Sequence, residues 1–340
     1  MPRLATVRQI EPCIERGIQN RLPGRHAHDS AMRRNTNLES SVCHRPYDTP
    51  VPRHLDWIQV FFAAMRVDFT KMHGLGNDFI VFDSPTAGFA PSRELWQRLA
   101  ARHTGIGFDQ ALMLEKPRQP GSAVFYRIFN ADGAEVEQCG NGARCIAALL
   151  SRRGTLPDGP MTLESAGGMV RARMAGGKLV AIDLGVPNFA PEALPFDAPS
   201  QADVYRLEID AQEVEIGAVS IGNPHAVLRV ASVAAADVAR LGPAIEHHRR
   251  FRQGANVGFM EITGRSSIRL RVHERGTGET LACGTGACAA VAIGRARGEL
   301  EADVQVIVRG GELRVNWAGP AEHIWLTGPA EVSFAGYFEV

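Results

Sequence analysis

The chain has 340 residues, 45% of them hydrophobic, and its 37 Lys and Arg residues balance 37 Asp and Glu residues to a formal net charge of zero. This balance argues against nucleic acid or an acidic membrane surface as the main partner and favours a small molecule. The length suits two domains with cores of their own. No apolar run reaches the ~18 to 20 residues of a membrane span, so we expect a cytoplasmic protein.

Residues 1–64 differ in composition from the rest of the chain. They hold nine arginines and no lysine, and no period of 2 or 3.6 residues is sustained among them. We predict that this segment is a disordered extension or follows a mis-assigned start codon. A transit peptide is the alternative, although Glu11, Glu15 and Asp29 weigh against it because such peptides are poor in acidic residues.

From Met65 onward, short strands outnumber helices, as alternating β-branched and aromatic residues indicate. The amphipathic run "SRELWQRLAARH" (92–103) predicts a first helix, and "ARCIAALLSRR" (143–153) a second. Next, "MVRARMAGGKLVAIDLG" (169–185) predicts a hairpin that turns at Gly-Gly. Four prolines in residues 185–200 suit an extended linker, which places a boundary near residue 184.

The second half repeats this order. The run "ACAAVAIGRARG" (287–298) predicts a helix, and "VQVIVRGGELRVNW" (304–317) predicts another hairpin through Gly-Gly. Two motifs recur at nearly the same separation: "CGNGARC" (139–145) returns as "CGTGAC" (283–288), and "LGNDFIVFD" (75–83) as "IGNPHAVLRV" (221–230). Recurrence at a fixed interval indicates one duplicated unit.

Cys139 and Cys283 each precede a Gly-x-Gly-Ala turn that opens a predicted helix. The free N–H groups and positive dipole of a helix N-terminus lower a thiol pKa and bind carboxylates. Cys145 and Cys288 fall inside the apolar helical runs, so we expect them to be buried core residues.

Two other uses of the cysteines remain open. A zinc site could recruit His73 or His225, but the cysteine intervals lead directly into helices instead of forming the short C-x2-4-C loops typical of zinc sites. A redox pair of Cys139 and Cys283 is also an alternative, although thiol oxidoreductases usually place both cysteines in one C-x-x-C motif. For His73 itself a structural role is the expectation.

The duplication favours a third use. If each half brings one cysteine to a cleft, one can act as thiolate base and the other as thiol acid on opposite faces of a carbon atom. Such a pair inverts a stereocentre. Both directions of the reaction need the same two groups, with the roles of acid and base exchanged. Two helix N-termini aimed at one α-carboxylate would stabilise the carbanion.

The stretches "KMHGLGNDF", "GFDQ", "YRIFNADG", "QCGNGARC", "GNPH", "ANVGFM", "ERGTGETLACGTGACA" and "TGPA" resemble those of the diaminopimelate epimerase family. The resemblance runs from Met65 to Val340 and implies conversion of LL-2,6-diaminopimelate to the meso form, in lysine and peptidoglycan synthesis, without pyridoxal phosphate, another cofactor or a metal. The chain has only three lysines, Lys71, Lys116 and Lys178. This scarcity agrees with the absence of pyridoxal phosphate, because enzymes that use it need a lysine for the Schiff base.

The resemblance also implies an α+β fold of two pseudo-symmetric domains, each a curved, mostly antiparallel sheet around a central helix. We expect the first domain at 65–183, completed by 329–340, and the second at 184–328, with a cleft between them that closes over the substrate. A homodimer is a further implication of the family.

Residue roles follow from the resemblance position by position. Cys139 and Cys283 would be the catalytic acid and base, with His225 and Glu274 tuning them. The positions that would bind substrate are Asn77, Gln110, Asn130, Gly140, Asn141, Asn223, Asn256, Glu274, Arg275, Gly284 and Thr285. The chain departs from the family pattern at His273, where Tyr is common, and at Thr285, where Ser is frequent.

Two alternative functions stay open. A related racemase or isomerase on the same scaffold could act on proline or hydroxyproline derivatives, although Asn130, Asn256 and Arg275 favour diaminopimelate. The non-enzymatic alternative is a thiol redox-sensing or ligand-binding module whose cysteines form a reversible disulfide.

Overall fold

The computed structural model describes residues 65–340 except 84–88, 138 and 155–158. The predictions for residues 1–64 lie outside this part of the chain. In the described part, no helix has the length and apolar character needed to cross a membrane.

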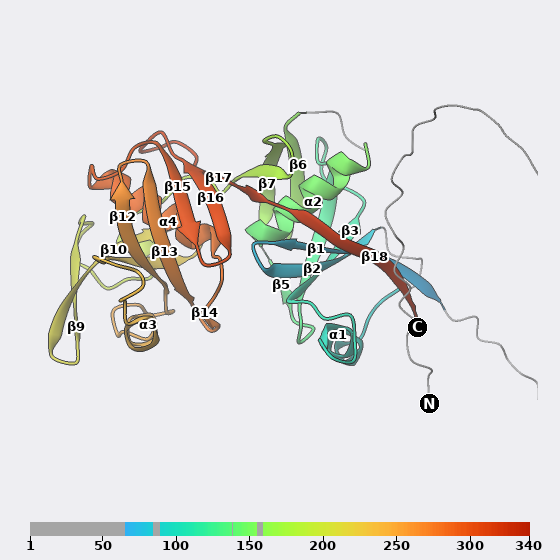
Figure 1. Ribbon diagram of the computed structural model, residues 1–340, viewed down its shortest axis with the longest axis horizontal. Coiled ribbons are helices and arrows are strands. Elements are labelled where there is room, and N and C mark those ends of the chain that lie inside the picture. Colours follow the sequence, from blue (N-terminus) through green and yellow to red (C-terminus); the bar gives the residue numbers. More distant parts are fainter. Residues whose placement is uncertain (1–64, 84–88, 138, 155–158) are drawn as a thin grey trace, which may run out of the picture. The chain divides into compact units, whose positions relative to one another are not determined.

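The first half of the described chain contains two helices among eight strands (Figure 1). Its elements are β1 (Arg66–Gly74), β2 (Asn77–Asp83), α1 (Arg93–Ala100), β3 (Gln110–Glu115), β4 (Val124–Asn130), β5 (Glu135–Val136), α2 (Gly140–Arg152), β6 (Met161–Ser165), β7 (Gly168–Met174) and β8 (Leu179–Asp183).

The second half adds ten strands, two α-helices and a 3₁₀ turn. Its elements are η1 (Pro191–Ala193), β9 (Tyr205–Ile209), β10 (Gln212–Ser220), β11 (Pro224–Arg229), α3 (Val238–Glu246), β12 (Asn256–Gly264), β13 (Ser267–Glu274), β14 (Gly278–Glu279), α4 (Gly284–Ala296), β15 (Asp303–Val308), β16 (Gly311–Asn316), β17 (Trp325–Pro329) and β18 (Glu331–Glu339).

Strand pairing repeats between the halves. In the first, β1–β2 is antiparallel, β2–β3 parallel, β3–β4 antiparallel, β4–β6 parallel, and β6–β7 and β7–β8 antiparallel. The series β10–β11, β11–β12, β12–β13, β13–β15, β15–β16 and β16–β17 has the same alternation. The duplication predicted from the sequence is therefore present in the backbone, and the predicted α+β, mostly antiparallel fold class is confirmed.

The halves are also joined by strands. β8 pairs antiparallel with β17, and the last strand, β18, returns to pair antiparallel with β1. Met65 and Val340 exchange backbone hydrogen bonds of 3.1 and 3.0 Å beyond that ladder. The beginning and end of the described chain are thus neighbours.

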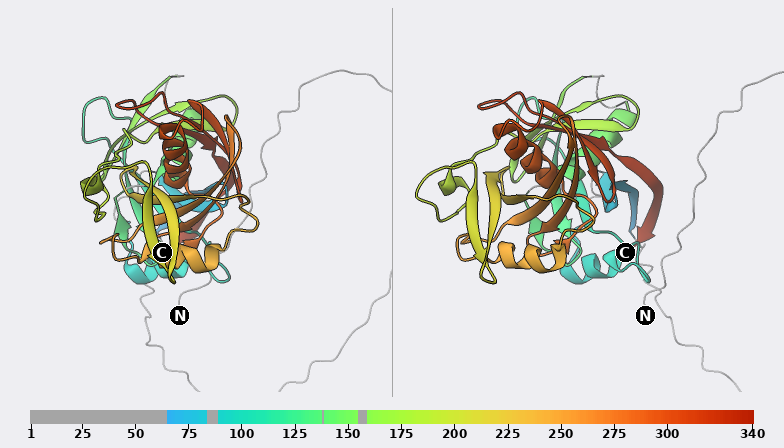
Figure 2. Two further views of the ribbon diagram at one scale, coloured as in Figure 1. Left: turned by 90° about the vertical axis from the view of Figure 1, so that its left-hand side faces the viewer. Right: turned by 60° about the vertical axis from the view of Figure 1, so that its left-hand side comes forward.

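One long helix packs against the concave side of each half. α2 contacts β1, β2, β6, β7, β8 and β18, whereas α4 contacts β10, β11, β12, β13, β16 and β17. Figure 2 shows strands of the second half curving around α4. Small side chains make this packing close, since Ala287–Ile293 are all buried. Cys145 and Cys288 are fully buried in this core, as predicted.

Two shorter helices cover other faces of the strands. α1 begins at the N-cap Ser92, whose hydroxyl accepts a hydrogen bond from the Leu95 N–H at 3.3 Å, and it ends at Ala100, earlier than the run 92–103 suggested. Its Trp96 stacks on Phe129 with ring centroids 5.1 Å apart.

Both predicted Gly-Gly hairpins are present, as β7–β8 and β15–β16. The proline-rich linker contains η1 and a turn at Leu194 and Pro195 directly after it, so it is only partly extended, contrary to the expectation.

Candidate active site

The two candidate cysteines occupy the same position on equivalent helices. Cys139 is the N-cap residue of α2 and Cys283 that of α4, and both have extended backbones, with φ of −149° and −120°. An N-cap side chain normally offers an oxygen to the first-turn N–H groups. Here a sulfur stands in its place, so that these N–H groups face a thiol or a bound anion at the positive end of the helix.

Burial opposes ionisation of both thiols. Cys283 is 4% exposed and Cys139 is partly exposed, and desolvation is the main reason that the pKa of each thiol lies above its usual range. The N–H groups of Asn141 and Gly142 lower the pKa of Cys139, as predicted for a helix N-terminus. However, the expected net lowering was wrong, because burial outweighs these groups.

The carboxylate of Glu274, at the end of β13, raises the pKa of both thiols. One charge therefore acts on a cysteine from each half. The Thr280 hydroxyl donates a 2.5 Å hydrogen bond to Glu274 Oε1 and fixes its orientation. Thr285 Oγ1 lies 3.6 Å from Cys283 Sγ and lowers the pKa of that thiol.

The first turns of α2 and α4 approach each other closely. A Cβ atom on Gly284 would lie 2.7 Å from Leu326 Cδ2 and 3.6 Å from the Asn141 Oδ1 atom. Glycine at the start of α4 thus lets the two helix N-termini meet. This closeness brings Gly140, Asn141, Gly284 and Thr285, four of the predicted binding residues, to one place.

In the first half, the predicted binding residues form two hydrogen-bonded groups. Asn141 Nδ2 donates to Asn77 Oδ1 at 3.1 Å, and Asn77 Nδ2 donates to Asp109 Oδ2 at 3.0 Å. Separately, Gln110 Nε2 donates to Asn130 Oδ1 at 2.9 Å. Each group joins different strands or a strand and α2, so its amides are held before any ligand binds.

In the second half, the Asn256 side chain is committed to the protein. Its Nδ2 donates to the Pro224 carbonyl at 3.1 Å and its Oδ1 accepts from the Arg275 N–H at 3.0 Å, with only 4% of the residue exposed. Asn256 therefore positions the turn that carries Glu274 and Arg275. The Arg275 side chain is exposed, and its Nη1 donates to the Gln253 carbonyl at 2.9 Å.

His225 is buried and neutral. Burial, followed by the nearby Arg275 charge, lowers its pKa to about 3. Its Nε2 lies 2.9 Å from Asn223 Oδ1, whereas its buried Nδ1 has no hydrogen-bond partner among the described residues. A neutral imidazole cannot tune a thiol through positive charge, and His225 is not among the groups that shift the pKa of either cysteine.

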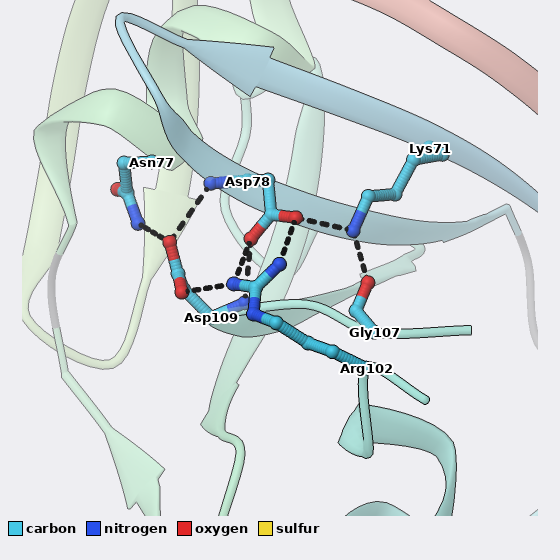
Figure 3. Close-up of polar contacts among 6 residues, drawn as sticks. All are labelled: Lys71, Asn77, Asp78, Arg102, Gly107 and Asp109. Atoms are coloured by element: carbon cyan, nitrogen blue, oxygen red, sulfur yellow. Dashed lines mark hydrogen bonds and ion pairs between the residues drawn. The ribbon is translucent and has the colours of Figure 1, made fainter. Parts of the chain in front are cut away.

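A charged cluster anchors Asn77 (Figure 3). Asp78 accepts from Lys71 Nζ at 2.6 Å and from both terminal nitrogens of Arg102 at 2.9 Å. Arg102 Nη2 also donates to Asp109 Oδ1 at 2.6 Å. These cations lower the pKa of Asp78 to about 2, against the opposing effect of burial, and Lys71 also donates to the Gly107 carbonyl.

Sequence reasoning missed this cluster. Lys71, Asp78 and Asp109 stand in the quoted stretches "KMHGLGNDF" and "GFDQ", but Arg102 joins them from the turn after α1. Their presence in these motifs was the available signal. His73, expected to be structural, lies in β1 opposite Glu331 of β18, whose pKa is lowered chiefly by the hydrogen bond from Lys178.

The glycine before each repeated asparagine requires a left-handed backbone. Gly76 has φ of 91° and Gly222 has φ of 80°, a region that L residues with side chains rarely adopt. Both halves therefore present Asn77 and Asn223 from the same kind of turn. As for metals, no three His, Cys, Asp or Glu side chains are grouped to hold an ion within the described part of the chain.

This duplicated fold defines a class of pseudo-symmetric two-domain α+β proteins. Solved structures of the class include a hydroxyproline epimerase from Agrobacterium vitis, with a TM-score of 0.59 at 17% identity over 81% of this chain and 93% of that one. A probable proline racemase from Agrobacterium radiobacter gives a TM-score of 0.57 at 19% identity over 79% and 92%. At these identities the likeness shows the fold alone.

Sequence comparison is more specific. The family model described as diaminopimelate epimerase matches residues 69–190 and 217–333. A diaminopimelate epimerase of Alkalilimnicola ehrlichii is 51% identical over 274 residues, covering 80% of this chain and 98% of that protein. One of Nitrosomonas europaea is 49% identical over 276 residues, covering 81% and 100%. The chain therefore belongs to the diaminopimelate epimerase family.

Proposed function

We propose that this protein is an isomerase that interconverts LL- and meso-2,6-diaminopimelate, with Cys139 and Cys283 as the acid and base. Family membership supports the substrate. The observation that carries the mechanism is the pair of N-cap thiols, one from each half, whose pKa values respond to the same Glu274 carboxylate.

In the proposed reaction, one thiolate takes the α-proton while the other thiol gives a proton to the opposite face of the carbanion. The proton lost from the substrate is balanced by the proton gained, and the thiols exchange protonation states. A turnover of about 10 s⁻¹ implies a barrier of about 16 kcal/mol. Acid and base groups contribute about 10² to 10⁴-fold, so the carbanion needs further stabilisation.

The helix N-termini are the proposed source of that stabilisation. Gly140, Asn141, Gly284 and Thr285 lie where N–H groups of both helices could bind the reacting carboxylate and hold charge that moves onto its oxygens. Arg275 would bind the distal carboxylate through its exposed guanidinium. Asn77, Gln110, Asn130, Asn223, Asn256 and Glu274 would complete or position the substrate site.

We also propose the domain limits 65–183 with 329–340 and 184–328, which the repeated pairing order and the β1–β18 ladder support. A homodimer and a cytoplasmic location belong to the proposal. Closure of the domains would exclude water and fix the acid and base around the substrate.

The test is a ¹H NMR time course in D₂O with LL-diaminopimelate under reducing conditions. We expect exchange of the α-proton with inversion, and a loss of about 10² to 10⁴-fold in Cys139→Ala and in Cys283→Ala. Cys145→Ala and Cys288→Ala are matched controls, since both residues are fully buried in the core, and they should keep activity. Wild-type-like turnover in either N-cap variant would sink the two-base mechanism.

A second candidate is racemisation of proline or hydroxyproline derivatives, which the fold shared with a hydroxyproline epimerase favours. The same exchange experiment with L-proline and trans-4-hydroxy-L-proline separates the two. Exchange with these substrates, and none with diaminopimelate, would replace the first proposal. A redox-sensing module would instead show a reversible Cys139–Cys283 disulfide and no exchange with any of them.

A further inference from the structure

Arg144 is a buried cation that the proposed chemistry has not yet used. It lies on α2, five residues after Cys139, and is 1% exposed. Its Nε and Nη1 atoms have no hydrogen-bond partner among the described residues. A buried guanidinium without a paired anion is costly, and such groups are rare in folded proteins. The cost calls for an anion that is present only in some states of the protein.

The protein builds a space for this side chain from glycines. A Cβ atom on Gly74 of β1 would lie 3.2 Å from Arg144 Nη2, and one on Gly328 of β17 would lie 3.3 Å from Nε. A Cβ on Gly284, the first residue of α4, would lie 3.9 Å from Nη1. The Arg144 side chain thus extends from α2, and its guanidinium reaches toward the first turn of α4. It lies between the two helices that begin at the candidate cysteines.

The second half has no equivalent charge at this position. The residue five after Cys283 is Cys288, which is fully buried and neutral when protonated, with burial raising its pKa far above the usual range. The duplicated motif therefore carries a cation in one copy only.

The groups around the two thiols differ accordingly. Around Cys139 they are the Asn141 and Gly142 N–H groups, Arg144 and Cys145 on α2, Glu274 on β13 and Tyr126 on β4. Burial raises the pKa of Cys139, and the Gly142 N–H and then the Arg144 charge lower it. Around Cys283 they are Glu274, Thr285 and the Gly286 N–H, and Glu274 raises the pKa of that thiol both by its charge and by accepting a hydrogen bond from it.

We propose that Arg144 is a positioning residue that makes Cys139 the more readily ionised of the two thiols, so that Cys139 serves as the thiolate base and Cys283 as the thiol acid. This inference rests on the proposed roles of the two cysteines and deepens them. In the singly ionised pair, Cys139 S⁻ would accept the α-proton, and Cys283 S–H would donate a proton to the opposite face. The product state holds Cys139 S–H and Cys283 S⁻ beside Glu274, and a proton that passes from Cys139 to Cys283 through water restores the Cys139 thiolate.

The wild-type protein offers the first test. Ultraviolet thiolate absorbance is followed against pH for the full chain and for Cys139→Ser and Cys283→Ser, and the difference curves isolate each thiol. Cysteines outside the pair cancel in the differences. We expect the Cys139 curve to have its midpoint at least about one pH unit below that of Cys283, a tenfold larger thiolate fraction. Equal midpoints, or the reverse order, would overturn the inference.

Arg144→Gln and Arg144→Lys, each in the Cys283→Ser background, supply the second test. The neutral variant should lose about tenfold of the Cys139 thiolate at a given pH, while the lysine variant keeps most of it, since it retains the charge. An unshifted Cys139 midpoint in folded Arg144→Gln would refute the proposal. A purely structural role would leave glutamine and lysine alike in this titration.

Folding is checked independently by alkylation of Cys145 and Cys288, which stay protected while the core is intact. Should Arg144→Gln unfold, the wild-type difference curves decide. These titrations need no substrate, so they separate the inference from the proposed function. If the protein does not epimerise diaminopimelate but the Cys139 midpoint lies below that of Cys283, only the proposed function is refuted. If it does epimerise diaminopimelate but the midpoints do not differ in this way, only the role of Arg144 is refuted.

Discussion

The two halves of the protein place the same residues at the same helix positions but surround them with different charges. Asn77 in the first half is held by Asp109 within a cluster that contains Lys71, Asp78 and Arg102. Its counterpart Asn223 is held by the neutral His225. The difference teaches that duplication preserved the backbone geometry at the proposed substrate site, while each half stabilises that geometry by its own means. Substitutions or pH changes that alter a charge should therefore change the stability of the two halves by different amounts.

Removing the charge of Asp78 should give the largest effect. Asp78→Asn leaves Lys71, whose side chain is 8% exposed, without its ionic partner. We expect the free energy of unfolding to fall by about 3 kcal/mol, as for other broken buried pairs. Asp68→Asn is the control, because Asp68 is 70% exposed in its pair with Arg66 and should lose under about 1 kcal/mol. Urea unfolding of both variants tests this, and equal losses would contradict a special role for the cluster.

Lowering the pH should reveal the charge difference between the halves as a loss of stability, because His225 and Asp78 take up protons in different pH ranges. The pKa of His225 falls from 6.5 to about 3 on folding, so below pH 6.5 the unfolded chain binds a proton that the folded chain excludes. Stability should then fall by up to about 1.4 kcal/mol per pH unit from this residue as the pH drops from 6.5 towards 3.

The pKa of Asp78 moves from 3.8 to about 2, so its contribution is complete above pH 3.8 and is lost as the pH falls through about 2. Urea unfolding between pH 7 and 4 should therefore show a loss that His225→Gln removes and His247→Gln, altered at a side chain 75% exposed, does not. An unchanged pH dependence in His225→Gln would show that the imidazole is not held neutral.

Glu274→Gln should have a smaller effect, which falls on the difference in ionisation between the two thiols. Because the Glu274 charge raises the pKa of both thiols and the hydrogen bond acts on Cys283, the variant should ionise Cys283 more readily and narrow the gap between the midpoints. We expect a loss of epimerisation of about tenfold as acid and base become less distinct. Thiolate titration alongside the exchange assay measures both. A widened gap would contradict the role assigned to this carboxylate.

Local patterns in the sequence were sufficient for the elements that carry the cysteines. The Gly-x-Gly-Ala turns predicted helix starts at Cys139 and Cys283, and the apolar runs predicted burial of Cys145 and Cys288. Such features depend on residues a few positions apart. The repeated motifs predicted the duplication, which the strand pairing confirmed.

Features that depend on distant parts of the chain were not predictable in the same way. The sign of the net thiol pKa shift was missed because burial is set by strands far away in sequence. Arg144 looks like an ordinary polar position in the helix, and only the glycines of β1, β17 and α4 show that it is enclosed. Likewise, Arg102 joins Asp78 across a turn that no motif marks.

The backbone exchange between Met65 and Val340 makes the described fold nearly a closed ring of chain. The order of its elements in space does not depend on where that ring is cut. A short peptide joining Val340 to Met65, with new termini opened in the linker between the halves, would make β18 and β1 consecutive and turn each half into one continuous segment. With the proposed domain limits, the described fold corresponds to a circular permutation of two consecutive units, in which the first unit is built from both ends of the described chain.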